Sequence, residues 1–151
     1  MDHAGEPYIA DSGRFVDPSV TDSERHYSVL THLMGLLSLL DMTIIGPIVV
    51  FVLWRVRFRE SDFIDDHGRE AVNFQLSLLL YVIAGSILAL ALTVMTCGIG
   101  AVFFTGIVGL MIFGLSILRI VGCVMGALAA GRREYFRYPM CLRFLKAPNE
   151  A

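Results

Sequence analysis

Charge is scarce in this chain of 151 residues. Charged residues make up 17% of it, and Lys146 is its single lysine. The net charge of -2 and the lack of a basic tract argue against a nucleic-acid partner. The first 26 residues also lack the basic start and apolar stretch of a cleavable signal peptide. Insertion into a membrane is therefore expected to use internal segments.

Catalytic and metal-binding motifs are missing as well. The sequence has no GxSxG, no HExxH and no phosphate-binding glycine loop. Its three cysteines, Cys97, Cys123 and Cys141, have no CxxC spacing. Two of them fall in or beside apolar runs, so we expect small buried hydrophobic residues rather than disulfide or metal partners. We therefore predict a protein that is not an enzyme and that has no cofactor.

Apolar residues are abundant, at 56% of the chain, and no residue from Ala71 to Leu118 is charged. A helix needs about 20 apolar residues to cross ~30 Å of hydrocarbon. The run therefore predicts two membrane-spanning helices, at about 71–95 and 101–129. The turn between them is expected at 96–100, where two glycines break the helix. Arg119, near the end of the second span, is expected to reach the lipid headgroups.

The stretch from Tyr27 to Trp54 allows two interpretations. A single span would place Asp41 near the bilayer centre, at a cost of about 2.5–3.5 kcal/mol or more. A hairpin of two short helices, at about 26–40 and 44–57, places Asp41 in a turn near an interface instead. Proline is also tolerated in the first turn of the second helix. The sequence favours the hairpin, and with it an all-α, polytopic membrane bundle of two short and two long helices.

The orientation follows from the basic residues. They gather in a loop expected at 55–70, which holds Arg55, Arg57, Arg59 and Arg69, and in the tail, which holds Arg132, Arg133, Arg137, Arg143 and Lys146. The turn at 96–100 is uncharged, so both basic segments lie on one side, which the positive-inside rule makes cytoplasmic. With four helices the N-terminus is cytoplasmic too, whereas with three it is outside.

Three regions follow from this pattern. Residues 1–25 are predicted to be a polar, flexible N-terminal arm, residues 26–146 the membrane helical bundle, and residues 147–151 a C-terminal tail. The stretch 130–139 mixes aromatic residues with arginines, so we expect an anchor in the headgroup zone. We assign Trp54, beside Arg55, to the same interfacial zone.

The densest group of polar residues is the segment 62–70, which we expect to precede the third helix. Carboxylates at a helix start satisfy free backbone N–H groups, and this is the favoured interpretation. The alternative is a divalent-metal site formed by Asp66, His67 and Glu70, with ligands that suit Mn, Fe or Zn. No second histidine pair at ligand spacing supports that site, so we predict no metal.

Two amides, Asn73 and Gln75, lie just inside the long apolar run. Amides at this depth usually hydrogen-bond across helices, and His32 and Ser38 are candidate partners. The alternatives are a pathway for a solute or an ion and, for His32, a proton relay.

Small residues form a stripe near the end of the last helix, at Gly122, Gly126 and Ala130. Such a stripe lets another helix approach closely. The pattern favours tight packing without choosing between packing within the bundle and self-association.

The string FIDDHGREAVNFQ at Phe63–Gln75 resembles the hallmark of a bacterial group of small membrane proteins of unknown function. Three further pieces fit the same pattern in order, at 30–33, 46–50 and 135–139, and the resemblance covers about 24–146. The group is similar to the twenty-kilodalton subunit of the chloroplast inner-envelope (Tic) import apparatus, and it includes magnetosome proteins of the MamF and MmsF kind. The residues themselves give no sign of a magnetosome setting.

The resemblance implies a four-helix membrane bundle and says little about chemistry. The family motif in this chain comprises Asp65, His67, Gly68, Glu70, Asn73, Phe74, Gln75, Tyr138 and Pro139.

Two functions of different class remain. The first is a non-enzymatic protein of the bacterial cytoplasmic (inner) membrane that assists the assembly or translocation of other proteins. Its partners would be the lipid bilayer and other membrane proteins or further copies of itself. The second is a small transporter or channel for an ion, a metal or a small solute. Its polar path would use Asp65, Asp66, His67, Glu70, Asn73 and His32.

Overall fold

The computed structural model describes residues 5–41 and 44–146. Four helices dominate it: α1 (Asp22–Met34), α3 (Ile45–Arg57), α4 (Asp62–Met95) and α5 (Ala101–Gly131). A 3-10 turn, η1 (Gly35–Leu37), joins α1 to the short helix α2 (Ser38–Asp41). Two strands, β1 (Tyr8–Ile9) and β2 (Phe15–Val16), form a small antiparallel hairpin before α1. The predicted helical bundle of two short and two long helices is confirmed.

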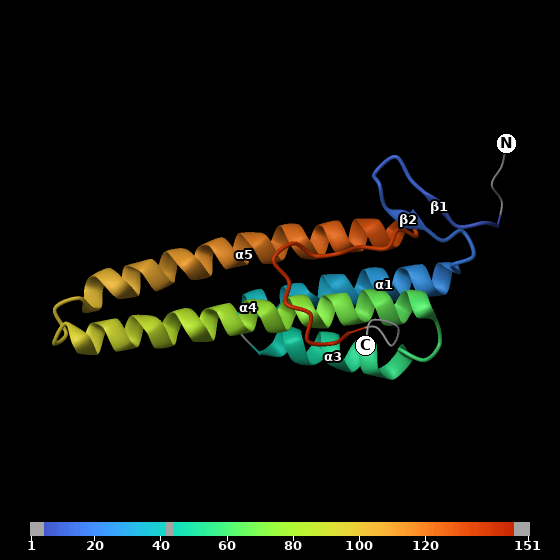
Figure 1. Cartoon of the computed structure of the whole chain (residues 1–151). Helices are drawn as coiled ribbons and strands as arrows, with labels where there is room; N and C mark the ends of the chain where they lie inside the picture. Colours follow the sequence, from blue (N-terminus) through green and yellow to red (C-terminus); the bar gives the residue numbers. More distant parts are fainter. Residues whose placement is uncertain (1–4, 42–43, 147–151) are drawn as a thin grey trace.

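The long helices α4 and α5 form an antiparallel hairpin (Figure 1). At 1.5 Å per residue, each is roughly 45–50 Å long. The shorter α1 and α3 lie beside only one half of this hairpin, the half that holds the start of α4 and the end of α5 (Figure 1). We call this half the base. The remainder of the hairpin, residues 82–114, is called the distal half.

The distal half is exposed on nearly all sides. Within an apolar stretch of 18 residues in each helix, only 6% of the stretch in α4 and 17% of the stretch in α5 is buried. The core helix of a soluble protein would be mostly buried, and these helices are far from the N-terminus, so neither is a signal sequence. Both helices are long and apolar enough to cross a bilayer. The chain is therefore a membrane protein.

The first apolar segment forms a hairpin rather than one span. Helix α3 has 13 residues, about 20 Å, which is too short to cross a bilayer alone. Gly46 allows α3 to pack closely against α2, because a Cβ atom at this position would collide with the side chain of Ser38. Asp41 ends α2, as the hairpin prediction requires. Residues 42–43 of the predicted turn lie outside the described residues.

Helix α4 begins at Asp62, so the prediction of a third helix from about 71 and of a loop at 55–70 is wrong. The side chain of Ser61 caps the helix by accepting a hydrogen bond from the Phe63 N–H at 3.2 Å. Hydropathy detects only the apolar part of a helix, and the first turns of α4 are charged. Arg69 therefore lies within α4, and Arg55 and Arg57 lie within α3.

The N-terminal segment makes specific contacts with the base. Val16 and Val20 are each only 5% exposed. Val16 forms a β-bridge with Glu134, just beyond α5, and the Arg14 guanidinium lies 3.0 Å from the Glu134 carboxylate. These contacts place the β-hairpin against the end of the bundle from which the C-terminal segment also emerges (Figure 1).

The predicted turn between the long helices is confirmed, since α4 ends at Met95 and α5 begins at Ala101. Cys97 and Gly98 adopt left-handed backbone angles, with φ of 52° and 83°. The Gly98 N–H closes the helix end by donating to the Thr93 carbonyl at 2.9 Å.

Candidate functional site: the polar core of the base

A chain of four hydrogen-bonded groups runs through the centre of the base. Tyr138 Oη lies 2.8 Å from His32 Nδ1, and His32 Nε2 lies 2.8 Å from His67 Nδ1. His67 Nε2 lies 3.1 Å from the Glu134 carbonyl oxygen. Both imidazoles have no measurable exposure to solvent. The chain thus connects α1, α4 and the segment after α5.

The direction of these hydrogen bonds is set at one end. Burial favours the neutral form of both imidazoles, in which one ring nitrogen donates and the other accepts. The Glu134 carbonyl oxygen can only accept, so His67 Nε2 carries the proton and its Nδ1 accepts from His32. His32 Nδ1 then accepts from the Tyr138 hydroxyl. Each imidazole then carries its single proton on Nε2. A further proton on His67 Nδ1 would face the His32 Nε2–H and break the bond between the two rings inside a buried site.

The C-terminal segment, residues 134–146, is held along one face of α4 by polar side chains. The Asn73 side chain donates to the Leu145 carbonyl and accepts from the Leu145 N–H, both at 2.9 Å. Ser77 Oγ accepts from the Leu142 N–H at 2.8 Å, and the Tyr81 hydroxyl donates to the Met140 carbonyl at 2.8 Å. The three side chains lie four residues apart, so they share one helix face. They provide hydrogen bonds that lipid tails could not supply.

Ion pairs fasten the same segment near the start of α4. The Arg137 guanidinium donates to both carboxylate oxygens of Asp66, at 2.6 and 2.7 Å. Glu70 accepts from Arg143 Nε and from the Tyr138 N–H, both at 3.3 Å. The paired bonds between Arg137 and Asp66 have the geometry that makes such contacts strong.

Gln75 faces a second polar cluster, deeper in the base. The Ser38 hydroxyl donates to its amide oxygen at 3.5 Å, and its amide nitrogen lies 3.7 Å from Cys123 Sγ. Arg119 is 4% exposed and donates to the Ser38 carbonyl at 3.4 Å. The prediction that Arg119 reaches the headgroups is wrong, because the side chain is buried in the base beside this carbonyl at the start of α2.

The small-residue stripe packs within the chain. A Cβ atom on Gly122 would lie 2.8 Å from the Phe74 ring, and one on Gly126 would lie 2.9 Å from both His32 Nδ1 and Tyr138 Oη. Ala130 is fully buried. The alternative left open by the sequence is resolved in favour of intramolecular packing. Aromatic and imidazole rings, rather than a helix backbone, occupy the space over the two glycines.

The predicted headgroup anchor at 130–139 is wrong for two of its aromatic residues. Phe136 and Tyr138 are 4% and 5% exposed, and the Tyr138 ring stacks on Phe74 with centroids 4.0 Å apart. The preceding Tyr135 is partly buried against Phe63, and burial raises its pKa to about 12. These rings pack inward because the segment folds back along α4.

The family-motif residues lie together in the base, except for Pro139, which is exposed. Gly68 allows the Trp54 ring to lie against α4, where a Cβ atom would come within 2.9 Å of the ring Cγ. Trp54 Nε1 in turn donates to the Asp65 carboxylate at 2.8 Å. The motif residues of α4 therefore contact the other helices of the base as well as the C-terminal segment.

The residues of the alternative metal site do not converge on one point. Asp66 and Glu70 bind arginines, and both nitrogens of His67 are used by His32 and Glu134. Within the described residues, no group of three or more His, Cys, Asp or Glu side chains is placed to hold a metal ion. Among the predicted partners of the amides, Ser38 does face Gln75, whereas His32 faces His67 instead.

Sequence reasoning missed the docking of the C-terminal segment and the part that Glu134 takes in it. One signal was available, since Asn73, Ser77 and Tyr81 repeat every four residues within an apolar run. Such a repeat indicates a polar face on a membrane helix, and a polar face needs a partner.

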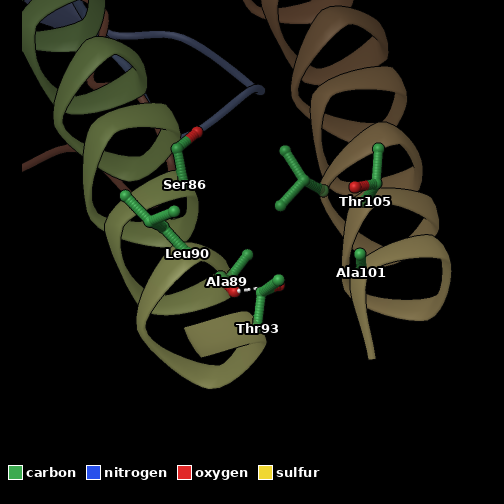
Figure 2. Close-up of a pocket in the computed structure, with 7 residues that line it drawn as sticks. Ser86, Ala89, Leu90, Thr93, Ala101 and Thr105 are labelled. Carbon is green, nitrogen blue, oxygen red and sulfur yellow. Dashed lines mark hydrogen bonds between the residues drawn. The ribbon is translucent and has the colours of Figure 1, made fainter. Parts of the chain in front are cut away.

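Between α4 and α5, the distal half contains a notch of about 280 Å³ (Figure 2). Small and hydroxylated side chains line it: Ser86, Ala89, Leu90, Thr93, Ala101, Thr105 and Val108. The Thr93 hydroxyl is already bonded to the Ala89 carbonyl at 2.8 Å. The notch holds no charged group, and the polar core of the base does not extend into it.

A family model described as the magnetosome magnetite crystal formation protein family (MamF/MmsF) matches residues 23–145. The chain belongs to this family. The match runs from the start of α1 to the docked C-terminal segment, so it includes the whole polar core of the base. It points to a magnetosome membrane protein, a setting that no residue pattern had indicated. No curated protein and no solved structure shows significant similarity to the chain.

Proposed function

We propose that this protein is a non-enzymatic component of the magnetosome membrane that assists the assembly of other membrane proteins there during magnetite crystal formation. The family description supports the setting. The exposed apolar helices support residence in a bilayer. Help in translocating other proteins is a narrower form of the same role, and it rests only on the resemblance of the sequence motif to the group that includes the chloroplast import subunit.

The observation that carries this proposal is the closed polar core of the base. The side chains of His32, His67, Glu70, Asn73 and Gln75 all bond to groups of the same chain. Their bonds join helices to one another and to the C-terminal segment, which is a structural task. No charged residue follows along α4 and α5 between Ala71 and Leu118. Ionisable groups at membrane depth commonly mark ion pathways.

The first test is deletion of the gene in a magnetosome-forming bacterium, with complementation by the wild-type chain fused to a fluorescent protein. We expect the fusion to align with the magnetosomes and the deletion to change crystal size or number. A fusion spread evenly over the cytoplasmic membrane, with unchanged crystals, would contradict the proposed setting.

A flux assay separates assembly from transport. The purified protein is reconstituted in vesicles that hold a pH-sensitive dye or a divalent-cation dye, with an ionophore as positive control. We expect no flux above that of empty vesicles. Flux that disappears in His67→Phe would favour the transporter, with the chain of Tyr138, His32 and His67 as its proton relay.

We also propose that the base faces the cytoplasm, because the arginine-rich connections gather at that end. Ser12 is exposed in the N-terminal hairpin and suits a single introduced cysteine, once the native cysteines are replaced. In intact cells, a membrane-impermeant thiol reagent should label Ser12→Cys only after lysis. Labelling before lysis would place the base outside.

A further inference from the structure

Most arginines of the base are paired with carboxylates, but three exposed ones among the described residues are not: Arg55, Arg59 and Arg132. Arg57 pairs with Glu60 at 2.6 Å, Arg69 with Asp65, Arg137 with Asp66 and Arg143 with Glu70. Arg55 and Arg59 are both exposed, and neither has a carboxylate partner within residues 5–41 and 44–146. Of the unpaired arginines, these two lie four residues apart along the chain.

One aromatic ring holds both guanidinium groups in place. Arg55 Cζ lies 4.5 Å from the centroid of the Phe58 ring, and Arg59 Cζ lies 5.2 Å from the same centroid. Contact with a ring face orients a guanidinium and leaves its N–H groups free to donate at its edge. The fork of N–H donors matches the oxygens of a phosphate group. Two guanidinium groups against one ring can therefore offer N–H donors to an anion.

The surroundings of this pair indicate where the anion comes from. Along α3, apolar side chains on the outer face lead toward Arg55: Ile48, Phe51, Val52 and Val56 are 46–69% exposed. Trp54 and Phe58 follow, with ring centroids 5.6 Å apart. An apolar face that ends in aromatic rings and arginines is the pattern of a helix that enters a bilayer and ends at its headgroups. At that depth, the available anion is a lipid phosphate.

We propose that Arg55 and Arg59, held against Phe58, form a binding site for the headgroup of an anionic phospholipid. The site would hold the end of α3 at the membrane surface, although α3 is too short to span. Because Trp54 shares this surface and α4 begins four residues after Phe58, a lipid bound here would also steady the base. The site does not depend on the assembly role proposed above.

The single tryptophan offers a direct test, because Trp54 lies against Phe58. The full-length protein in neutral detergent is titrated with phosphatidylglycerol or with phosphatidylcholine, each brominated on its acyl chains near the headgroup. Bromine quenches the fluorescence of a tryptophan that it contacts. We expect phosphatidylglycerol to quench Trp54 at a clearly lower mole fraction. Equal quenching by the two lipids would overturn the proposal.

Variants assign the preference to these two side chains. At about fivefold in affinity for each arginine near a membrane surface, R55Q/R59Q should bind the anionic lipid roughly 25-fold more weakly. R55K/R59K keeps both charges but loses the guanidinium fork and its contact with the ring, so it should bind the anionic lipid more weakly than wild type and more tightly than R55Q/R59Q. Arg132→Gln, which removes an exposed arginine at the end of α5, should behave as wild type.

Two results would refute the assignment. If Arg132→Gln loses as much preference as R55Q/R59Q, the effect is a general attraction between charges and not a site. If inorganic phosphate at millimolar concentration restores the fluorescence fully, the site binds free phosphate rather than a lipid. Circular dichroism of each variant confirms that the helices are intact, which is expected because both arginines are exposed.

Discussion

The docking of the C-terminal segment depends most directly on Asn73. Its side chain makes two hydrogen bonds of 2.9 Å to the backbone of Leu145, one to the carbonyl and one to the N–H. In Asn73→Leu both bonds are lost. At about 1 kcal/mol for each bond, the docked state should lose roughly 2 kcal/mol relative to the released state.

Limited proteolysis measures this loss. Trypsin cuts after arginine and lysine, and Arg143 and Lys146 lie within the docked segment. If the segment opens and closes faster than it is cut, the cleavage rate follows the population of the released state. A loss of roughly 2 kcal/mol then corresponds to about 30-fold faster cleavage in Asn73→Leu.

Gln75→Leu is the matched control. Gln75 is also a buried amide of α4, but its contacts reach Ser38 and Cys123 rather than the C-terminal segment. We expect this variant to lower the thermal stability of the bundle in detergent while cleavage of the segment accelerates much less. If the two variants are cut at the same rate, or if Asn73→Leu is cut no faster than wild type, the docking by Asn73 is refuted.

Three further predictions concern other parts of the base. In Gly126→Ala the added methyl group would lie 2.9 Å from the His32 imidazole and the Tyr138 hydroxyl, so we expect the free energy of unfolding in detergent to fall by about 1–3 kcal/mol. Gly109→Ala, where the methyl group enters open space, should leave this free energy unchanged. Equal effects of the two variants would contradict the packing. Tyr138→Phe removes the donor at one end of the buried hydrogen-bond chain, so we expect the free energy of unfolding to fall by about 1–2 kcal/mol. A stability unchanged within error would show that this bond is not needed. Hydrogen bonds, foremost from Ser61, hold the pKa of Glu24 below its ordinary value. The stabilisation from the Glu24 carboxylate is therefore present above the ordinary pKa of a glutamate and is lost as the pH falls through the lowered pKa. Glu24→Gln should consequently lose less stability than wild type when the pH is lowered. The same loss of stability in both proteins at low pH would contradict this role of Glu24.

Much of the architecture was predictable because it depends on local chemistry. The uncharged run from Ala71 to Leu118 can be stable only as helices in a bilayer, and the glycines near residue 98 supply the turn. Asp41 in the middle of the first apolar segment makes a single span costly, so a pair of short helices follows. These features depend on the composition of each segment and on its length, which a sequence displays directly.

The start of α4 and the direction of Arg119 could not be predicted in this way. The first turns of α4, residues 62–70, are charged and precede the apolar run. Hydropathy therefore gives no indication that they are helical, and the sequence predicts a loop there. Arg119 near a helix end suits contact with headgroups in isolation. In the folded chain it is buried beside the Ser38 carbonyl, which the α1–α3 hairpin brings close to it.

The sequence by itself therefore determined the helices, the membrane as their solvent and the residues of the family motif. Only the tertiary structure decided what those motif residues do. His32 and His67 meet because α1 packs beside α4, and Asn73 bonds Leu145, which is 72 residues away along the chain. The physical reason is that a buried polar group must find a partner, while the sequence states only that the group is there. Which partner it finds depends on how the chain folds back on itself.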